Sequence, residues 1–238
     1  MVRSIVFGIL VYVTTALWVI LGFPFFFTPR RWSMEALKVH ARTELWLLKH
    51  IVGLDFEVRG LDKLPEPPFL IASKHQSAWE TFALIPLFRD PALLMKRELF
   101  LIPFHGLFSY KFGMIPVDRD KGPSALRNML RHAKDRVAKG REILIFPEGT
   151  RRPPGAPPAY KTGIALLYGA LDVPCVPVAL NSGVFWPRRT WRRKPGTVVV
   201  EILDPLPAGL PKAEFMARLQ ESIETASDGL WAEARADV

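Results

Sequence analysis

The segment from Ile5 to Phe27 contains no charged residue, and it constrains the fold of this chain more than any other stretch. A helix of that extent would reach about 35 Å, against about 30 Å of bilayer hydrocarbon. Gly22 and Pro24 lie inside the segment and predict a break, after which the chain re-enters the membrane or lies in its interface. The segment therefore predicts membrane attachment, either as a full span or as an in-plane anchor.

A second helix is predicted directly after this segment. Apolar residues recur near helical spacing over residues 34–52, at Leu37, Ala41, Leu45, Leu48 and Val52. We therefore expect residues 1–52 to form N-terminal membrane-anchoring helices and residues 53–238 to form one further domain.

Charge indicates an orientation and an anionic partner. Basic residues cluster after the apolar segment, at Arg30, Arg31, Lys38 and Arg42, whereas Arg3 alone precedes it. If the segment spans, this bias places the globular body on the cytoplasmic face of the cytoplasmic membrane. The net charge of +9 is compatible with nucleic acid, anionic lipid headgroups or a phosphorylated substrate. A nucleic-acid-binding protein would leave the uncharged segment unexplained, so we expect no nucleic-acid partner.

Beyond residue 52, short apolar runs alternate with longer helical patterns, which is typical of a layered α/β domain. The pattern predicts a mixed sheet flanked by helices. Strands are expected at 56–59, 69–73, 92–96, 113–117, 142–146, 176–181 and 197–202, and helices from about Ser77 and over 124–139, 161–171 and 212–235. The single cysteine, Cys175, lies in an apolar run and is expected to be a buried, inert thiol.

A histidine and a carboxylate lie where the predicted strand 69–73 leads into a helix. Ser77 and Glu80 form an S-x-x-E capping box, which points the Glu80 carboxylate back toward His75. Inside one helix His75 and Glu80 would lie about 140° apart, so their pairing requires His75 to precede the cap. Taken alone, these residues are better explained as an ordinary capping glutamate and a loop histidine, and they indicate a site only together with the motifs downstream.

Two further motifs carry groups suited to phosphate. They are Gly113-Met114-Ile115-Pro116-Val117-Asp118-Arg119 and Phe146-Pro147-Glu148-Gly149-Thr150-Arg151. Arg119 and Arg151 offer planar forks of donors that match phosphate oxygens. Gly149 permits close backbone approach, and Thr150 adds a hydroxyl donor beside the loop amides. A lone arginine is usually a solvated surface charge, but two arginines in two such motifs favour a phosphate site.

The motifs and their order resemble those of the glycerolipid acyltransferase family, which includes the 1-acylglycerol-3-phosphate acyltransferases. The family blocks are H-x-x-x-x-D/E, G-x-I-P-V-x-R, F-P-E-G-T-R and an apolar strand, the last matched here by 176–180. The resemblance spans residues 70 to 180 and departs at Glu80, where aspartate is the common residue.

The resemblance implies catalytic roles for two residues and binding roles for six. His75 would take the proton of the acceptor hydroxyl, and Glu80 would hold the imidazole. Direct transfer needs no covalent acyl-enzyme, so we interpret Ser77 as a helix cap rather than a nucleophile. Glu148 would help form the acceptor site by orienting an arginine or a glycerol hydroxyl. The implied substrate-binding residues are Lys96, Arg119, Glu148, Gly149, Thr150 and Arg151.

The implied reaction moves a fatty acyl group from an acyl thioester to the sn-2 hydroxyl of lysophosphatidic acid, giving phosphatidic acid. Acyl-CoA or acyl-carrier protein would be the co-substrate, and we expect no cofactor and no metal. Glycerol-3-phosphate or another lysolipid are alternative acceptors, and a non-catalytic, membrane-anchored lipid-binding scaffold is an alternative function. A second basic run, 188–194, contains Trp191 and indicates contact with anionic lipid or a solvated loop.

Overall fold

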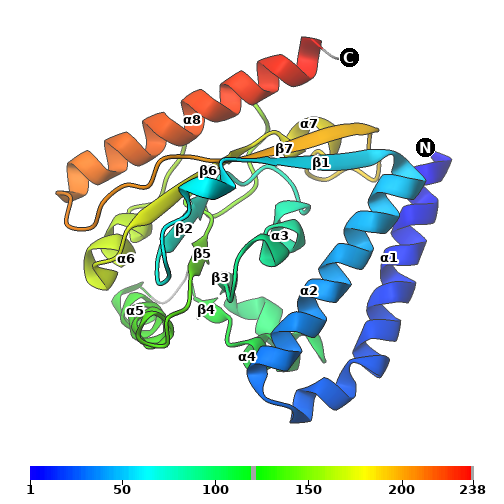
Figure 1. The fold of residues 1–238 in the computed structure, drawn as a ribbon, viewed down its shortest axis with the longest axis horizontal. Helices are drawn as coiled ribbons and strands as arrows, with labels where there is room; N and C mark the ends of the chain where they lie inside the picture. Colours follow the sequence, from blue (N-terminus) through cyan, green and yellow to red (C-terminus); the bar gives the residue numbers. More distant parts are fainter. Residues whose placement is uncertain (119–121, 237–238) are drawn as a thin grey trace.

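Seven strands form one mixed sheet in the order β1-β7-β6-β2-β5-β3-β4 in the computed structural model, which describes residues 1–118 and 122–236 (Figure 1). Strands β6 and β7 pair antiparallel, and the other neighbouring pairs are parallel. The predicted mixed α/β sheet is confirmed. The strands are β1 Leu54–Arg59, β2 Leu70–Ser73, β3 Ala92–Lys96, β4 Ile115–Val117, β5 Ile143–Ile145, β6 Cys175–Leu180 and β7 Gly196–Ile202.

Helices cover both faces of this sheet (Figure 1). In strand β2, Leu70 and Ala72 belong to the apolar core on one face, whereas Ile71 belongs to the core on the other. Helices α5, α6 and α8 close the first core, and α1 to α4 pack toward the second. The helices are α1 Val2–Leu21, α2 Arg30–Leu47, α3 Glu80–Ala83, α4 His105–Phe112, α5 Gly122–Ala138, α6 Gly163–Leu171, α7 Ser182–Phe185 and α8 Lys212–Ala236.

The N-terminal segments form a helical hairpin. Helix α1 ends at Leu21, a 3-10 turn spans Phe23–Phe27, and α2 runs back beside α1 (Figure 1). The break predicted at Gly22 and Pro24 is therefore present. A π-helical turn at Leu48–Val52 extends α2 and ends at Gly53, whose positive φ of 80° suits glycine. Among the described helices, α1 alone is long and apolar enough to cross a membrane.

Both ends of this hairpin contact the globular body. Near the start of α1, Phe7 is fully buried and meets Trp186 edge-to-face, with ring centroids 5.9 Å apart. Beyond the far end of α1, Phe26 meets Phe108 of α4 at 6.0 Å. The hairpin therefore lies along the body from one end of α1 to the other.

Helix α4 was not predicted from the sequence. Its apolar side chains do not share one buried face, since Leu107 and Tyr110 are 43% and 63% exposed. The amphipathic spacing that indicates a surface helix is consequently lacking there. Helix α3 also begins later than predicted, at Glu80 rather than near Ser77.

Candidate active site

Three loops, which carry the residues of the H-x-x-x-x-E and F-P-E-G-T-R motifs and those that follow β6, leave the sheet at one edge. Strands β2, β5 and β6 are mutually parallel neighbours, so their carboxyl ends lie together. In open α/β sheets this edge is the usual place for a ligand site. The loops that follow these strands begin at Lys74, Phe146 and Asn181.

His75 and Glu80 form the predicted pair. The distance from His75 Nδ1 to Glu80 Oε1 is 2.9 Å, and His75 precedes α3, as the pairing requires. The Glu80 side chain is completely buried, and that of His75 is 12% exposed. A carboxylate only accepts hydrogen bonds, so an ionised Glu80 keeps the proton on Nδ1 and leaves Nε2 as the free acceptor.

Three further donors hold the Glu80 carboxylate. Its Oε1 accepts from the backbone amides of Gln76 at 2.7 Å and Ser77 at 2.6 Å, and its Oε2 accepts from the Ser182 hydroxyl at 2.8 Å. The Ser77 hydroxyl is itself buried and accepts from the amide of Trp79 at 3.2 Å, a local contact in the turn before α3. The residue that caps α3 is Trp79, without a side-chain cap, so the expectation that Ser77 caps this helix is wrong because α3 begins later than predicted. The buried charge is thus surrounded by hydrogen bonds, which offset its loss of hydration.

Two further contacts hold His75, one on the face of its imidazole ring and one at its backbone carbonyl. Phe146 stacks on the ring with centroids 4.1 Å apart and an angle of 16° between the planes. The carbonyl of His75 accepts from the amide of Arg152 at 2.8 Å. These contacts join the His75 loop to the Phe146–Arg151 motif.

Glu148 lies in a buried network of charges beneath the same loop. Its Oε1 accepts from Lys74 Nζ at 3.1 Å, and its Oε2 accepts from the His75 amide at 3.4 Å. Lys74 Nζ also donates to both oxygens of Glu224 on α8, at 2.7 and 2.8 Å, and Tyr160 donates to Glu224 at 2.9 Å. The cation that meets Glu148 in the structure is therefore Lys74. The expected role of this carboxylate in orienting an arginine or a glycerol hydroxyl stays a prediction.

Burial raises the pKa values of two groups in this network. Desolvation raises the pKa of Glu148 above its ordinary value, against the opposing influence of the Lys74 charge. Desolvation, reinforced by the Glu224 carboxylate, also raises the pKa of the Tyr160 hydroxyl, which stays protonated as a donor.

The other predicted binding residues differ in exposure and in the partners they contact. Gly149 adopts a positive φ of 66° and turns the chain, and Thr150 is exposed beside it. The Arg151 guanidinium has no hydrogen-bond or ion-pair partner within the described residues. Lys96 ends β3 with its side chain 51% exposed and lies 3.7 Å from Glu98 rather than against the His75–Glu80 pair. Arg119 falls outside the described residues.

Comparison with known proteins places this arrangement in a family. The family model for acyltransferases matches residues 55–181, more than half of the chain. The chain belongs to the acyltransferase family.

Individual relatives of this acyltransferase extend the likeness beyond the matched domain. It is 35% identical over 205 residues to 1-acyl-sn-glycerol-3-phosphate acyltransferase of Pseudomonas aeruginosa, covering 84% of this chain and 79% of the relative. It is 32% identical over 173 residues to the human 1-acyl-sn-glycerol-3-phosphate acyltransferase beta, covering 71% and 62%. The crystal structure of the acyltransferase PlsC from Thermotoga maritima matches its fold with a TM-score of 0.81 at 19% identity, over 96% of both chains.

Sequence reasoning missed several groups at the site of this acyltransferase. Ser182 lies two residues after the end of the fourth motif, and this nearness was a usable signal. Lys74 precedes the predicted histidine, and Phe146 opens the third motif, but nothing in their types indicated an ion pair or a ring stack. Glu224 had no local signal, because only the packing of α8 brings it to Lys74.

Proposed function

We propose that this acyltransferase moves a fatty acyl group from an acyl thioester to the sn-2 hydroxyl of lysophosphatidic acid, producing phosphatidic acid. The observation that carries the proposal is the 2.9 Å contact between His75 Nδ1 and Glu80 Oε1 at the edge where the motif loops meet. The names of the relatives support lysophosphatidic acid as acceptor. Acyl-CoA and acyl-carrier protein both remain candidate donors.

His75 acts as the general base in this proposal. Its Nε2 takes the proton of the acceptor hydroxyl while the oxygen attacks the thioester carbonyl. The carbon–sulfur bond then breaks, and the imidazolium returns the proton to the departing thiolate. Glu80 stabilises the imidazolium, and the Phe146 ring limits rotation of the imidazole.

The acceptor phosphate is proposed to bind the Phe146–Arg151 loop. The Arg151 guanidinium is available for a bidentate contact, and Thr150 and the turn at Gly149 lie next to it. Arg119 and Lys96 are proposed as further cations. Glu148 is proposed to support this site indirectly, by holding Lys74 and the His75 backbone beneath it.

Purified wild type and His75→Ala would be incubated with labelled oleoyl thioester and lysophosphatidic acid, as both the CoA and carrier-protein thioesters. Glycerol-3-phosphate and other lysolipids would be tested in parallel. His132→Ala on α5 is the matched control. We expect phosphatidic acid from wild type and the control, and a loss of roughly 100- to 10,000-fold for His75→Ala.

Each outcome of this assay separates the candidate functions. Activity only with a different acceptor would support acyl transfer by His75 but would show that lysophosphatidic acid is not the acceptor. Product formation by His75→Ala at the wild-type rate would overturn the role of the base. Absence of activity with every acceptor would favour the lipid-binding scaffold.

For the membrane, we propose an in-plane anchor on one leaflet. Helix α1 is about 30 Å long, so a span would place its two ends on opposite sides of the hydrocarbon. Contacts of the same body with Phe7 and Phe26, near both ends, support the in-plane anchor over that separation. The exposed apolar side chains of α1, among them Ile9, Val13 and Leu17, would then face the lipid. The basic residues after α1 favour the cytoplasmic leaflet.

Labelling with a membrane-impermeant maleimide tests this anchor. Val2→Cys lies at the first residue of α1 and Arg31→Cys lies beyond its far end, at the start of α2. The native Cys175 gives little background because it is fully buried and burial raises its thiol pKa. We expect both variants to be labelled from the cytoplasmic side of inverted vesicles. Labelling of the two positions from opposite sides would establish a span instead.

A further inference from the structure

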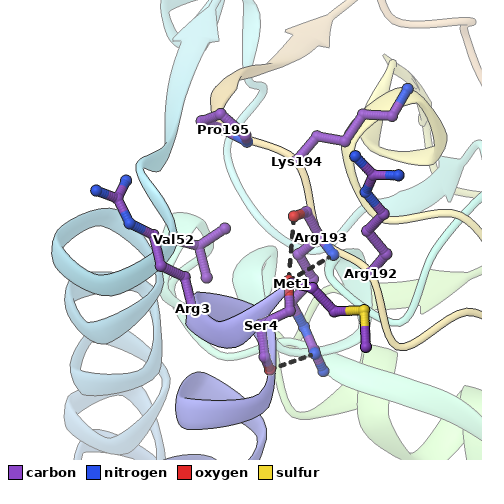
Figure 2. A pocket seen from close by; sticks show the side chains of 8 residues that line it. All are labelled: Met1, Arg3, Ser4, Val52, Arg192, Arg193, Lys194 and Pro195. Carbon is purple, nitrogen blue, oxygen red and sulfur yellow. Dashed lines mark hydrogen bonds between the residues drawn. The ribbon is translucent and has the colours of Figure 1, made fainter.

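Two adjoining hollows lie between the start of α1 and the loop that precedes β7. The basic hollow, of about 140 Å³, is lined by Arg3, Arg192 and Lys194 among others (Figure 2). The apolar hollow, of about 610 Å³, is lined by Ile5, Ile9, Tyr12 and Trp191 among others. Both include Met1 and Arg192 in their walls, so a single elongated molecule can occupy them together.

Arg193 fixes the loop against α1. The Ser4 hydroxyl accepts from the Arg193 amide at 3.0 Å, and the Arg193 guanidinium donates to the Ser4 carbonyl at 3.2 Å. The guanidinium also lies over the rings of Phe7 and Trp186, at 4.9 and 4.1 Å. Because Arg193 is held in this way, its neighbours 192 and 194 are presented at the rim of the basic hollow (Figure 2).

The cations of the basic hollow lack a counter-charge within the protein. In the described part of the chain, no carboxylate forms an ion pair with Arg3, Arg192 or Lys194. Figure 2 shows the tips of Arg192 and Lys194 on one side of the hollow and that of Arg3 on the other. An anion bound between them would offset their mutual repulsion.

The exposed apolar surface of the second hollow indicates which class of anion would bind. Ile9, Tyr12 and Trp191 are 59%, 71% and 70% exposed, so their apolar surfaces are open to a ligand. A free phosphate or a nucleic acid would leave this surface uncovered, whereas an amphiphile would cover it. Tryptophan and tyrosine are also the side chains that favour the membrane interface.

We propose that the two hollows bind an anionic phospholipid of the host bilayer, with its phosphate in the basic hollow and one acyl chain against Ile9, Tyr12 and Trp191. This lipid would be a bound membrane component at the start of α1, not a substrate at His75. The proposal rests on the proposed membrane attachment and does not depend on the proposed acyl transfer at His75.

Flotation of the full-length protein on vesicles tests the basic hollow. Partitioning would be compared between pure phosphatidylcholine vesicles and vesicles that also contain phosphatidylglycerol. The test variant is Arg192→Gln/Lys194→Gln, and the control, Lys134→Gln/Lys212→Gln, makes the same charge change on α5 and α8. We expect the test variant to lose roughly 30-fold in partitioning to the anionic vesicles, which is typical of two basic residues at a membrane surface.

Tryptophan fluorescence tests the apolar hollow. Quenching by bromine-labelled acyl chains would be measured in wild type and in Trp191→Phe, so that their difference reports on Trp191. We expect brominated phosphatidylglycerol to quench this component more than brominated phosphatidylcholine does, and the preference to vanish in Arg192→Gln/Lys194→Gln.

The outcomes are distinguishable. Equal losses in the test and control pairs, or equal quenching by the two lipids, would overturn the site. Failure to bind neutral vesicles would overturn the membrane anchor instead. Unchanged acyl transfer in detergent and an unchanged melting temperature for the test variant would establish that its fold is intact.

Discussion

The hydroxyl of Ser182 donates a hydrogen bond to Glu80 Oε2 over 2.8 Å, joining residues that are 102 positions apart in the sequence. Both side chains are completely buried. The backbone amides of Gln76 and Ser77 hold the other carboxylate oxygen, so Ser182 fixes the oxygen that the local loop leaves free. This contact orients the long glutamate arm at a position where aspartate is the common residue of the family.

Ser182→Ala should lower kcat with little change in the KM of the acceptor. A hydrogen bond to a charged group contributes about 1.5–3 kcal/mol, so we expect a loss of roughly 10- to 100-fold. Ser182→Cys keeps a weak donor and should give an intermediate rate. Steady-state kinetics would measure both variants, and an unchanged kcat for Ser182→Ala would remove Ser182 from the positioning of Glu80.

Ser77→Ala should retain substantial activity. The substitution removes a buried hydrogen bond to the Trp79 amide, which typically costs about 1 kcal/mol of stability, but it leaves the His75–Glu80 pair in place. The rate and the melting temperature would be measured beside those of His75→Ala. A loss as complete as that of His75→Ala would identify Ser77 as a nucleophile and replace direct transfer by an acyl-enzyme.

Lys74→Met should strongly destabilise the fold. The substitution leaves the carboxylates of Glu148 and Glu224, which are 0% and 18% exposed, without their shared cation. Breaking a buried ion pair costs about 3–5 kcal/mol, which corresponds to a fall in melting temperature of roughly 10 °C for a chain of this size.

Lys63→Met is the matched control for that measurement. Lys63 pairs with Asp204 at 3.1 Å on the surface, where Asp204 is 88% exposed. Exposed pairs contribute about 0–1 kcal/mol, so its melting temperature should stay within a few degrees of wild type. If the melting temperature of Lys74→Met fell by no more than that of Lys63→Met, the buried Lys74 network would add nothing to stability beyond an exposed pair.

Glu148→Gln should change the pH dependence of stability. The pKa of Glu148 is raised in the folded protein above its ordinary value of 4.5, so the folded state binds its proton more tightly than the unfolded state does. Wild type therefore loses stability from this group as the pH rises through 4.5 and the folded pKa. Because glutamine does not ionise, the melting temperature of the variant relative to wild type should increase over that interval.

Thermal unfolding at a series of pH values would measure this trend. Glu221→Gln is the control, because Glu221 is exposed on α8. Its difference from wild type measures the effect of the same glutamate-to-glutamine change at the surface of α8. A difference for Glu148→Gln that falls as the pH rises would contradict the raised pKa.

The sequence was most informative where a structural feature depends on neighbouring residues. The His75–Glu80 contact follows from the short spacing and from the Glu80 side chain reaching back to the Ser77 amide, and both are local. The buried strand β2 is a continuous apolar run because helices cover both its faces. The break at Gly22 and Pro24 likewise follows from the residues themselves.

Contacts between distant segments could not be predicted from the sequence. Glu224 reaches Lys74 across 150 positions, and its place on α8 resembles that of any partly exposed helical glutamate. The attachment of α1 through Ser4 and Arg193 depends in the same way on tertiary packing. The phosphate-binding role of Arg119 stays a prediction, since this residue lies outside the described part of the structure.

The pairing of β1 with β7 has a consequence for the timing of synthesis. Leu54 of β1, the first strand to be made, pairs with Gly196 of β7, the last strand of the sheet. Ribosomes add about 5–20 residues per second, so β1 waits for several seconds with its pairing edge open, next to an anchor that has already been made. During that interval the nascent chain is exposed to mispairing, and a chain terminated before residue 196 would keep that edge open permanently.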